Sequence, residues 1–243
     1  MSTSSRNGRK SSASRLILAA AALTPLAWRQ ASATTYQWIG GTSDWNNAAN
    51  WTPSGGPPGD GDTANVTSSL GLTQTVTYDE TGFVYQLTGL DLNLTGGNGI
   101  NGEMLSIAAN TLSCAIENVG GFADSPAKGV GTIDQSGGEN LVNDPIASLG
   151  VSGLTLGYNV GDDGFYNLSG GTLLSEELAA EPILAYYPPP FPAIETVGLS
   201  GVGVFNQTGG TNLLMPARSG DAAILCLGSN AGSTGTYILS GSA

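Results

Sequence analysis

The sequence has no histidine, only two cysteines and few charged side chains, which make up 11% of its 243 residues. Histidine is the commonest general base and the commonest metal-ligating side chain in proteins. Its absence excludes Ser-His-Asp and Cys-His catalysis as well as histidine-based metal centres. We therefore do not expect this chain to be an enzyme.

The two cysteines lie 112 residues apart, at Cys114 and Cys226. Strand-like alternation puts Cys114 on the same face as Leu112, but it puts Cys226 opposite Leu225 and Leu227. These opposite facings favour two unpaired small side chains, with a disulfide as the alternative.

Basic residues are scarce and unevenly distributed. Five of the seven Lys and Arg residues precede residue 34, whereas all 19 Asp and Glu residues follow it. Residues 34–243 thus carry 2 basic and 19 acidic side chains, a formal net charge of −17. A surface this acidic repels nucleic acid and anionic lipid, so we expect no nucleic-acid partner.

A long apolar run occurs only near the amino terminus, at residues 16–28. Basic, serine-rich residues precede it, and Ala31 and Ala33 follow as small side chains at a cleavage site. The pattern predicts a signal peptide at residues 1–33 and a secreted or cell-surface protein. An uncleaved anchor is the weaker alternative, because thirteen helical residues are too few to cross about 30 Å of hydrocarbon. We expect no transmembrane segment after the signal peptide is removed.

Glycine is abundant, with 37 residues, and it marks a unit that the chain repeats four times. Each unit starts with glycine, alternates in polarity and reaches a Ser/Thr-Gly corner, as in residues 164–171. The third position is always large and apolar: Ile133, Tyr166, Phe205 and Tyr237. Alternation in short runs predicts strands, and side chains at one aligned position stack about 4.8 Å apart when strands pair. We therefore predict an all-β fold, a right-handed, parallel β-helix or β-solenoid.

The corners start at residues 136, 169, 208 and 240, with spacings of 33, 39 and 32 residues. A glycine at such a corner permits positive φ. The longest insertion, Ser175–Ile194, contains Tyr186 and Tyr187 and is the best candidate for a contact surface. The solenoid is expected to span residues 73–243. Because the last repeat stops before its third strand, we expect the chain to be a fragment of a longer protein.

Residues 34–72 contain three tryptophans, Trp38, Trp45 and Trp51. We interpret this segment as a hydrophobic cap over the first coil, since an uncapped solenoid end exposes its core and its strand edges. The alternative is a carbohydrate contact in which the three tryptophans, together with Tyr186 and Tyr187, stack on sugar rings.

Carboxylates that could serve a metal or a reaction are few. Asp60 and Asp62 are two potential calcium ligands, well short of the six to eight oxygens that calcium takes. Asp162 and Asp163 form a carboxylate pair, but they lie between glycines, where aspartate is a common turn residue. We expect both pairs to be turn residues and expect no cofactor; calcium remains the alternative.

Two parts of the chain resemble secreted bacterial proteins that carry autotransporter-associated β-strand repeats, often with a carboxy-terminal Pro-Glu-Pro sorting tail. Residues 38–64, from Trp38-x-Gly-Gly to Thr63-Ala64, are similar to the segment that follows the signal peptide in such proteins. The Leu-Gly and Gly-x-Tyr-x-Leu-Ser-Gly-Gly-x-Leu units are similar to their body. The resemblance implies an exported β-helical protein, usually without assigned catalysis.

Three functions compete at this stage. The first is an exported structural or adhesive protein that contacts extracellular polysaccharide or cell-surface components. The second is a carbohydrate-binding module that uses the aromatic residues named above. The third is a β-helix polysaccharide lyase or hydrolase, which needs closely placed carboxylates or a calcium site with a basic residue. We favour the first.

Overall fold

The structure, a computed structural model, describes residues 33–68, 74–82, 84–95, 103–123, 128–144, 153–177, 193–216 and 222–241. These residues form strands joined by short turns, with one turn of 3-10 helix, η1 (Ala48–Asn50). The all-β prediction is confirmed. Within the described ranges, no helix has the length and apolar character needed to cross a membrane.

Most strands fall into six successive layers of the chain. Layers 1 to 3 comprise β4 (Thr63–Ser68), β5 (Gln74–Thr77) and β6 (Gln86–Leu87); β7 (Gly89–Thr95), β8 (Glu103–Ile107) and β9 (Thr111–Cys114); and β10 (Ile116–Val119) and β11 (Gly129–Asp144). Layers 4 to 6 comprise β12 (Gly153–Leu156) and β13 (Asp163–Glu177); β14 (Ala193–Val197), β15 (Val202–Gln207) and β16 (Thr211–Met215); and β17 (Ala223–Leu227) and β18 (Thr234–Leu239).

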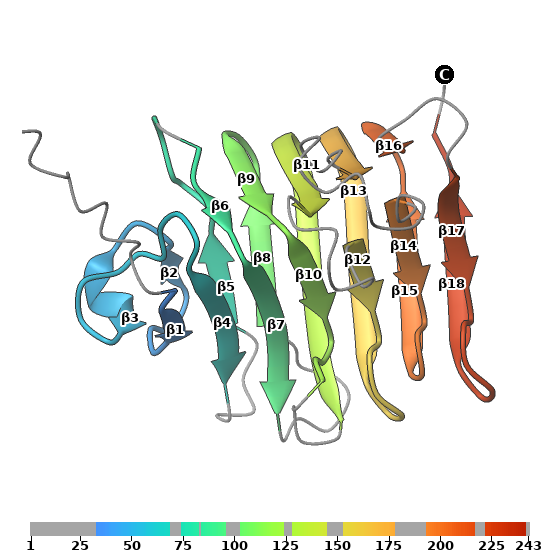
Figure 1. Cartoon of the computed structure of the whole chain (residues 1–243), viewed down its shortest axis with the longest axis horizontal. Helices are drawn as coiled ribbons and strands as arrows, with labels where there is room; N and C mark the ends of the chain where they lie inside the picture. The colour runs from blue at the N-terminus through green and yellow to red at the C-terminus, as the bar shows by residue number, and fades with distance from the viewer. Residues whose placement is uncertain are drawn as a thin grey trace, which may run out of the picture. The chain divides into compact units, whose positions relative to one another are not determined.

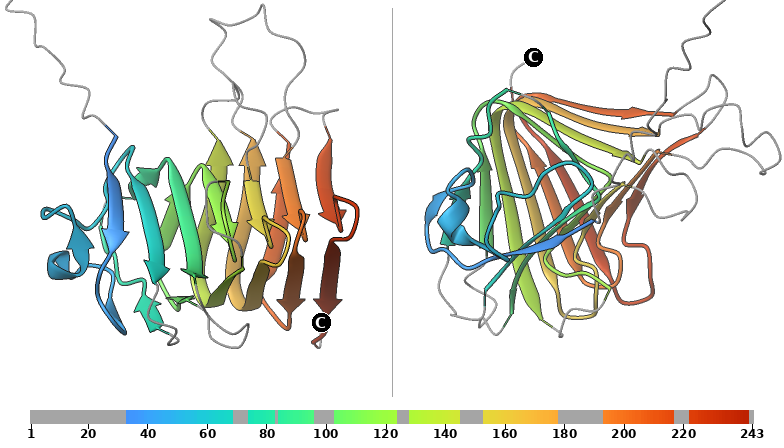
Figure 2. Two further views of the ribbon diagram at one scale, coloured as in Figure 1. Left: turned by 90° about the horizontal axis from the view of Figure 1, so that it is seen from below. Right: turned by 60° about the vertical axis from the view of Figure 1, so that its left-hand side comes forward.

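Each layer pairs in parallel with the next, so three ladders run through the layers (Figure 1, Figure 2). The first ladder is β4–β7–β10–β12–β14–β17. The second is β5–β8–β11–β13–β15–β18. The third is β6–β9–β11–β13–β16, which uses the second halves of the long strands β11 and β13. Parallel pairing of strands distant in sequence agrees with the prediction from the repeats.

The amino-terminal segment adds further strands to layer 1. β1 (Thr35–Trp38) pairs in parallel with β4, and β2 (Ser43–Asp44) pairs in parallel with β5. β3 (Trp51–Thr52) pairs antiparallel with β1. Parallel pairing thus begins in the segment that we expected to be only a cap, before residue 73. The cause is that β4 carries the same alternation as β7, with Ala64 and Val66 buried.

The large side chains at the third position of each repeat form a buried row. Ile133, Tyr166 and Phe205 have no exposed surface. The ring of Phe205 lies 5.0 Å from that of Tyr166 and 4.7 Å from that of Tyr237, with interplanar angles of 5° and 7°. These rings belong to paired positions of β13, β15 and β18. The predicted inward stack is confirmed.

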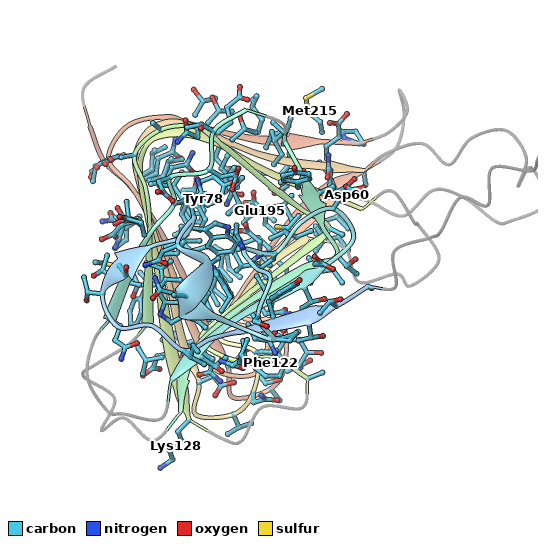
Figure 3. The ribbon with its side chains drawn as sticks, turned by 90° about the vertical axis from the view of Figure 1, so that its left-hand side faces the viewer. Asp60, Tyr78, Phe122, Lys128, Glu195 and Met215 are labelled. Carbon is cyan, nitrogen blue, oxygen red and sulfur yellow. The ribbon has the colours of Figure 1, made fainter. Side chains whose placement is uncertain are left out.

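The alternating positions point outward and form a polar row. Asn167 Nδ2 donates a hydrogen bond to Asp134 Oδ1 (2.6 Å), and Asn206 Nδ2 donates to Asn167 Oδ1 (3.5 Å). Figure 3 shows the same division of side chains: Tyr78 and Glu195 project into the interior between the ladders, whereas Lys128 and Met215 point away from it. Amide ladders of this kind link successive layers from outside, where water competes for each bond.

The glycine corners have the predicted geometry. Gly138, Gly171 and Gly210 have φ values of 63°, 78° and 64°, the left-handed region that other residues rarely adopt. At Gly171 space is also short, because a Cβ atom would overlap the carbonyl oxygen of Gly138 in the layer before it. Stacked corners therefore require glycine for two reasons: the positive φ and the close approach of neighbouring layers.

This arrangement predicts that Gly171→Ala destabilises the protein more than Gly232→Ala does. Both glycines have positive φ, 78° and 86°, but a Cβ atom at Gly232 meets nothing within 4 Å. Gly232→Ala should cost about 1 kcal/mol for the left-handed backbone alone, and Gly171→Ala should cost more because its layers must separate. Urea denaturation of the two variants measures the difference. Equal midpoints would show that the layers do not approach closely at this corner.

Candidate functional site

The three tryptophans of the amino-terminal segment are buried, each at most 3% exposed. The ring of Trp51 packs edge-to-face against Trp38 (5.0 Å, 80°) and Trp45 (4.7 Å, 69°), and its Nε1 donates to the carbonyl oxygen of Trp45 (2.8 Å). A sugar would need an open ring face. The three rings pack against one another and leave no open face for the carbohydrate contact that we gave as the alternative to a cap. Tyr186 and Tyr187, the other predicted contact residues, lie outside the described residues.

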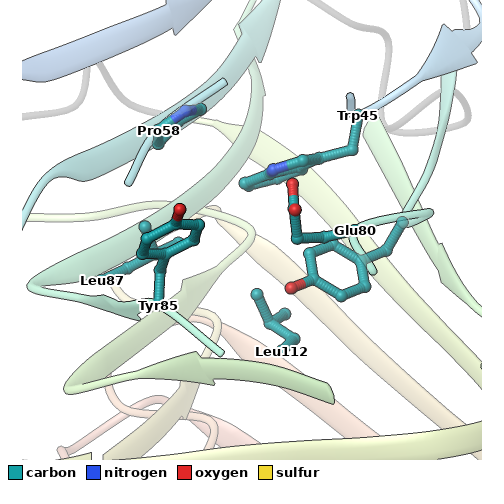
Figure 4. Close-up of a pocket in the computed structure, with 7 residues that line it drawn as sticks. Trp45, Pro58, Glu80, Tyr85, Leu87 and Leu112 are labelled. Atoms are coloured by element: carbon teal, nitrogen blue, oxygen red, sulfur yellow. The ribbon is translucent and has the colours of Figure 1, made fainter. Parts of the chain in front are cut away.

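A shallow recess lies beside this cluster (Figure 4). The residues around it are Trp45, Pro58, Tyr78, Glu80, Tyr85, Leu87 and Leu112. Its enclosed space of about 10 Å³ has room for about one water molecule. Partial burial and the neighbouring Asp79 raise the pKa of Glu80 above its ordinary value. The recess is much too small to enclose a sugar ring.

The two carboxylates considered as calcium ligands serve the backbone instead. Asp62 accepts hydrogen bonds from the N–H groups of Thr34 (2.9 Å) and Gly59 (2.9 Å), and Asp60 accepts one from Gln86 N (3.2 Å). A search of the described ranges finds no group of three or more Cys, Asp or Glu side chains able to hold a metal ion. These carboxylates fix the turn that leads into β4.

The two carboxylates of the Asp162-Asp163 pair have different surroundings. Asp162 is fully buried, and its two oxygens accept from Gly129 N (2.8 Å) and Asn159 N (2.7 Å). Asp163 begins β13, and desolvation and the charge of Asp162 raise its pKa. Because the Asp162 carboxylate is buried, closes a turn and holds the start of β11, it is not accessible to a substrate.

We predict that Asp162→Ala destabilises the fold by about 2–3 kcal/mol, because the buried N–H group of Gly129 and the half-buried N–H group of Asn159 lose their acceptor. Asp163→Ala, which removes a partly exposed carboxylate from the same corner, should cost about 0.5 kcal/mol or less. Paired urea denaturation curves check both values. Asp163→Ala proving the more damaging would contradict this account of the corner.

Sequence reasoning missed a set of buried polar side chains between the ladders. Glu117 in β10 has no exposed surface; Asn140 Nδ2 donates to its Oε2 (3.0 Å), and the Cys114 thiol donates to its Oε1 (3.2 Å). Asn140 Nδ2 also donates to the hydroxyl oxygen of Tyr166 (3.1 Å), and that hydroxyl donates to Gln135 Oε1 (2.6 Å). The five side chains form one connected network.

A second network has the same plan two layers on. Asn212 Nδ2 donates to Glu195 Oε2 (2.9 Å), and Ser175 Oγ donates to Glu195 Oε1 (2.8 Å). The Tyr237 hydroxyl donates to Gln207 Oε1 (2.6 Å) and lies 3.4 Å from Asn212 Nδ2. Strand pairing places Glu117 and Glu195 on either side of the same residue, Leu154 of β12, and local alternation in the sequence did not mark either carboxylate as inward.

Burial dominates the ionisation of both carboxyl groups. Desolvation raises the pKa of Glu117 to about 7, although the hydrogen bonds from Cys114 and Asn140 act in the opposite direction. Desolvation likewise raises the pKa of Glu195, against hydrogen bonds from Asn212 and Ser175. Both Glu117 oxygens and both Glu195 oxygens are engaged by neighbouring side chains. These carboxyl groups therefore link neighbouring strands of the interior through hydrogen bonds, and their burial keeps them out of contact with a substrate.

The two cysteines are free, as the opposite facings predicted. Cys114 is buried and Cys226 is half-buried. Burial and the adjacent Glu117 raise the pKa of the Cys114 thiol well above its ordinary value, which keeps it protonated and able to donate.

Comparison of the chain with protein-family models, with characterised proteins and with solved structures finds no match.

Proposed function

We propose that this chain is an exported structural or adhesive protein, built as a right-handed parallel β-solenoid that presents its outer surface and has no catalysis of its own. The proposal rests on the packing of side chains in the interior. In-register side chains join layer to layer, from the tryptophan cluster through the aromatic stack of Tyr166, Phe205 and Tyr237. Such a core resists unfolding through neighbour contacts and leaves the outer face free to vary.

Export is supported by the amino-terminal pattern. Ala31 and Ala33 stand at the expected cleavage site, and β1 begins two residues later, at Thr35. Cleavage after Ala33 would release the described strands intact. The strongly acidic composition after residue 34 fits an extracellular protein that must stay soluble despite its many strands.

The test is expression of the full chain in a bacterium, followed by mass spectrometry of the exported material. We expect a mature chain that begins at Thr34. A variant with Ala31→Arg and Ala33→Arg should retain the leader, because the cleavage site needs small residues. Accumulation of the unmodified chain inside the cell, still beginning at Met1, would refute the proposal of export.

A further inference from the structure

The interior alternates between apolar and polar layers. Along the first ladder the paired inward residues are Leu90, Glu117, Leu154, Glu195 and Leu225. Along the second they are Ile107, Gln135, Leu168, Gln207 and Leu239. Along the third they are Leu112, Asn140, Leu173 and Asn212. Layers 2, 4 and 6 are thus apolar at these positions, and layers 3 and 5 are polar.

Each polar layer depends on the apolar layer that follows it. The hydroxyl of Tyr166 in layer 4 bonds to Gln135 in layer 3, and the hydroxyl of Tyr237 in layer 6 bonds to Gln207 in layer 5. Each polar layer also takes a donor from the layer before it, Cys114 for layer 3 and Ser175 for layer 5. The structural unit is therefore two layers, because a polar layer forms side-chain hydrogen bonds to the apolar layers on both sides of it, although Asn140 Oδ1 and Asn212 Oδ1 have no partner.

Layer 6 differs from layer 4 in the exposure of its inward apolar side chains. Leu225 and Leu239 are 42% and 74% exposed, whereas their counterparts in layer 4, Leu154 and Leu168, are at most 1% exposed. Leu154 and Leu168 are covered by Glu195 and Gln207 of layer 5. Among the described strands, β17 and β18 pair only with β14 and β15 of layer 5. Layer 6 therefore presents both an apolar face and open strand edges.

We propose that this exposed face of layer 6 is a docking surface for a β-layer of the polar kind, with strands that pair in parallel with β17 and β18. Such a layer places Glu opposite Leu225 and Gln opposite Leu239, as layer 5 does on layer 4. The occupant follows from continuity with the interface between layers 4 and 5. A second apolar layer fits less well, since a tyrosine like Tyr237 would then stack on Tyr237 and its hydroxyl would meet Leu239 in place of a glutamine acceptor. The proposal concerns layer pairing and is independent of export.

The test uses two extended forms of the full chain, which differ in the kind of layer placed on layer 6. In the first extended chain, residues 171–241 follow Gly241, which recreates the corner of residues 169–171 and adds a copy of layer 5, the polar kind, on layer 6, followed by a copy of layer 6. In the second, residues 210–241 follow Gly241, so the same join puts a copy of layer 6 directly on layer 6. The outward substitution Thr236→Ser in each appended copy separates its peptides from the original ones by mass.

Hydrogen exchange of residues 223–239 in the original layer 6 is measured in the unextended and both extended chains. We expect exchange to slow at least tenfold with the polar layer and much less with the apolar copy. Equal protection in both extended chains, or none in the first, would overturn the proposal. So would a dimer of the unextended chain, detected by sedimentation, that protects these same residues, because a second copy would then occupy the face.

Discussion

Phe205→Ala is expected to lower the free energy of unfolding by about 3–5 kcal/mol, the usual range for truncating a buried phenylalanine. Phe205 has no exposed surface, and its ring stacks between those of Tyr166 and Tyr237 at 5.0 and 4.7 Å. Its removal leaves a cavity that borders three layers at once. Because each layer is stabilised mainly by its neighbours, the loss should loosen layers 4, 5 and 6 together. Guanidinium denaturation of the mature chain measures the effect.

Val204→Ala is the matched control, since Val204 precedes Phe205 on the same strand and faces outward, where it is only half-buried. We expect it to cost about 1 kcal/mol or less. A greater loss at Val204 than at Phe205 would mean that β15 faces the other way.

The free energy of unfolding is expected to fall by about 3 kcal/mol as pH rises from about 4.5 to above 7, through Glu117 alone. Desolvation raises the pKa of this buried carboxyl from 4.5 to about 7. Between those values the unfolded chain has lost the proton while the folded chain still holds it, so folding is penalised progressively. The stabilisation is complete below the unfolded pKa and is lost as pH rises through the folded pKa. Glu117→Gln cannot ionise and should remove this part of the slope.

Other buried carboxyl groups also contribute to the loss of stability over this pH range, so Glu117 is tested together with Glu195. The pKa of Glu195 is also raised, so Glu117→Gln alone should leave a residual slope and Glu117→Gln with Glu195→Gln a smaller one. Denaturant midpoints at pH 5 and pH 8 for the unsubstituted chain and the two variants give the comparison. A slope that persists undiminished in the double variant would place the responsible groups elsewhere.

The sequence was sufficient for the features that depend on local repetition. The third-position row of Tyr166, Phe205 and Tyr237 and the glycine corners were predictable because each repeat carries the same residue types at the same spacing. Pairing in register then brings equal positions together, which multiplies a weak local signal. The burial of Trp45 and Trp51 was predictable as a cap, since three large aromatic side chains within fourteen residues seldom all stay in water.

The polar layers were not predictable from the same signal. Glu117 and Glu195 lie 78 residues apart, in strands whose alignment depends on insertions of unequal length. A single carboxylate in a strand normally predicts an outward position, because burying its charge is costly. Hydrogen bonds make the inward position tolerable: Asn140 and Cys114 donate to Glu117, and Asn212 and Ser175 donate to Glu195. Those partners come from a different ladder, which local alternation does not reveal.

Disulfide trapping between neighbouring layers tests the in-register stacking most directly. Asn167 and Asn206 are paired positions of β13 and β15 and both point outward. In a Cys226→Ser background, Asn167→Cys with Asn206→Cys should form a disulfide under mild oxidation, because Cα atoms of paired strands lie about 5 Å apart. Asn167→Cys with Val204→Cys, two residues out of register on the same face, should stay reduced. Peptide mapping that finds the 167–206 bridge alone agrees with the stacked layers, and a 167–204 bridge in its place would contradict them.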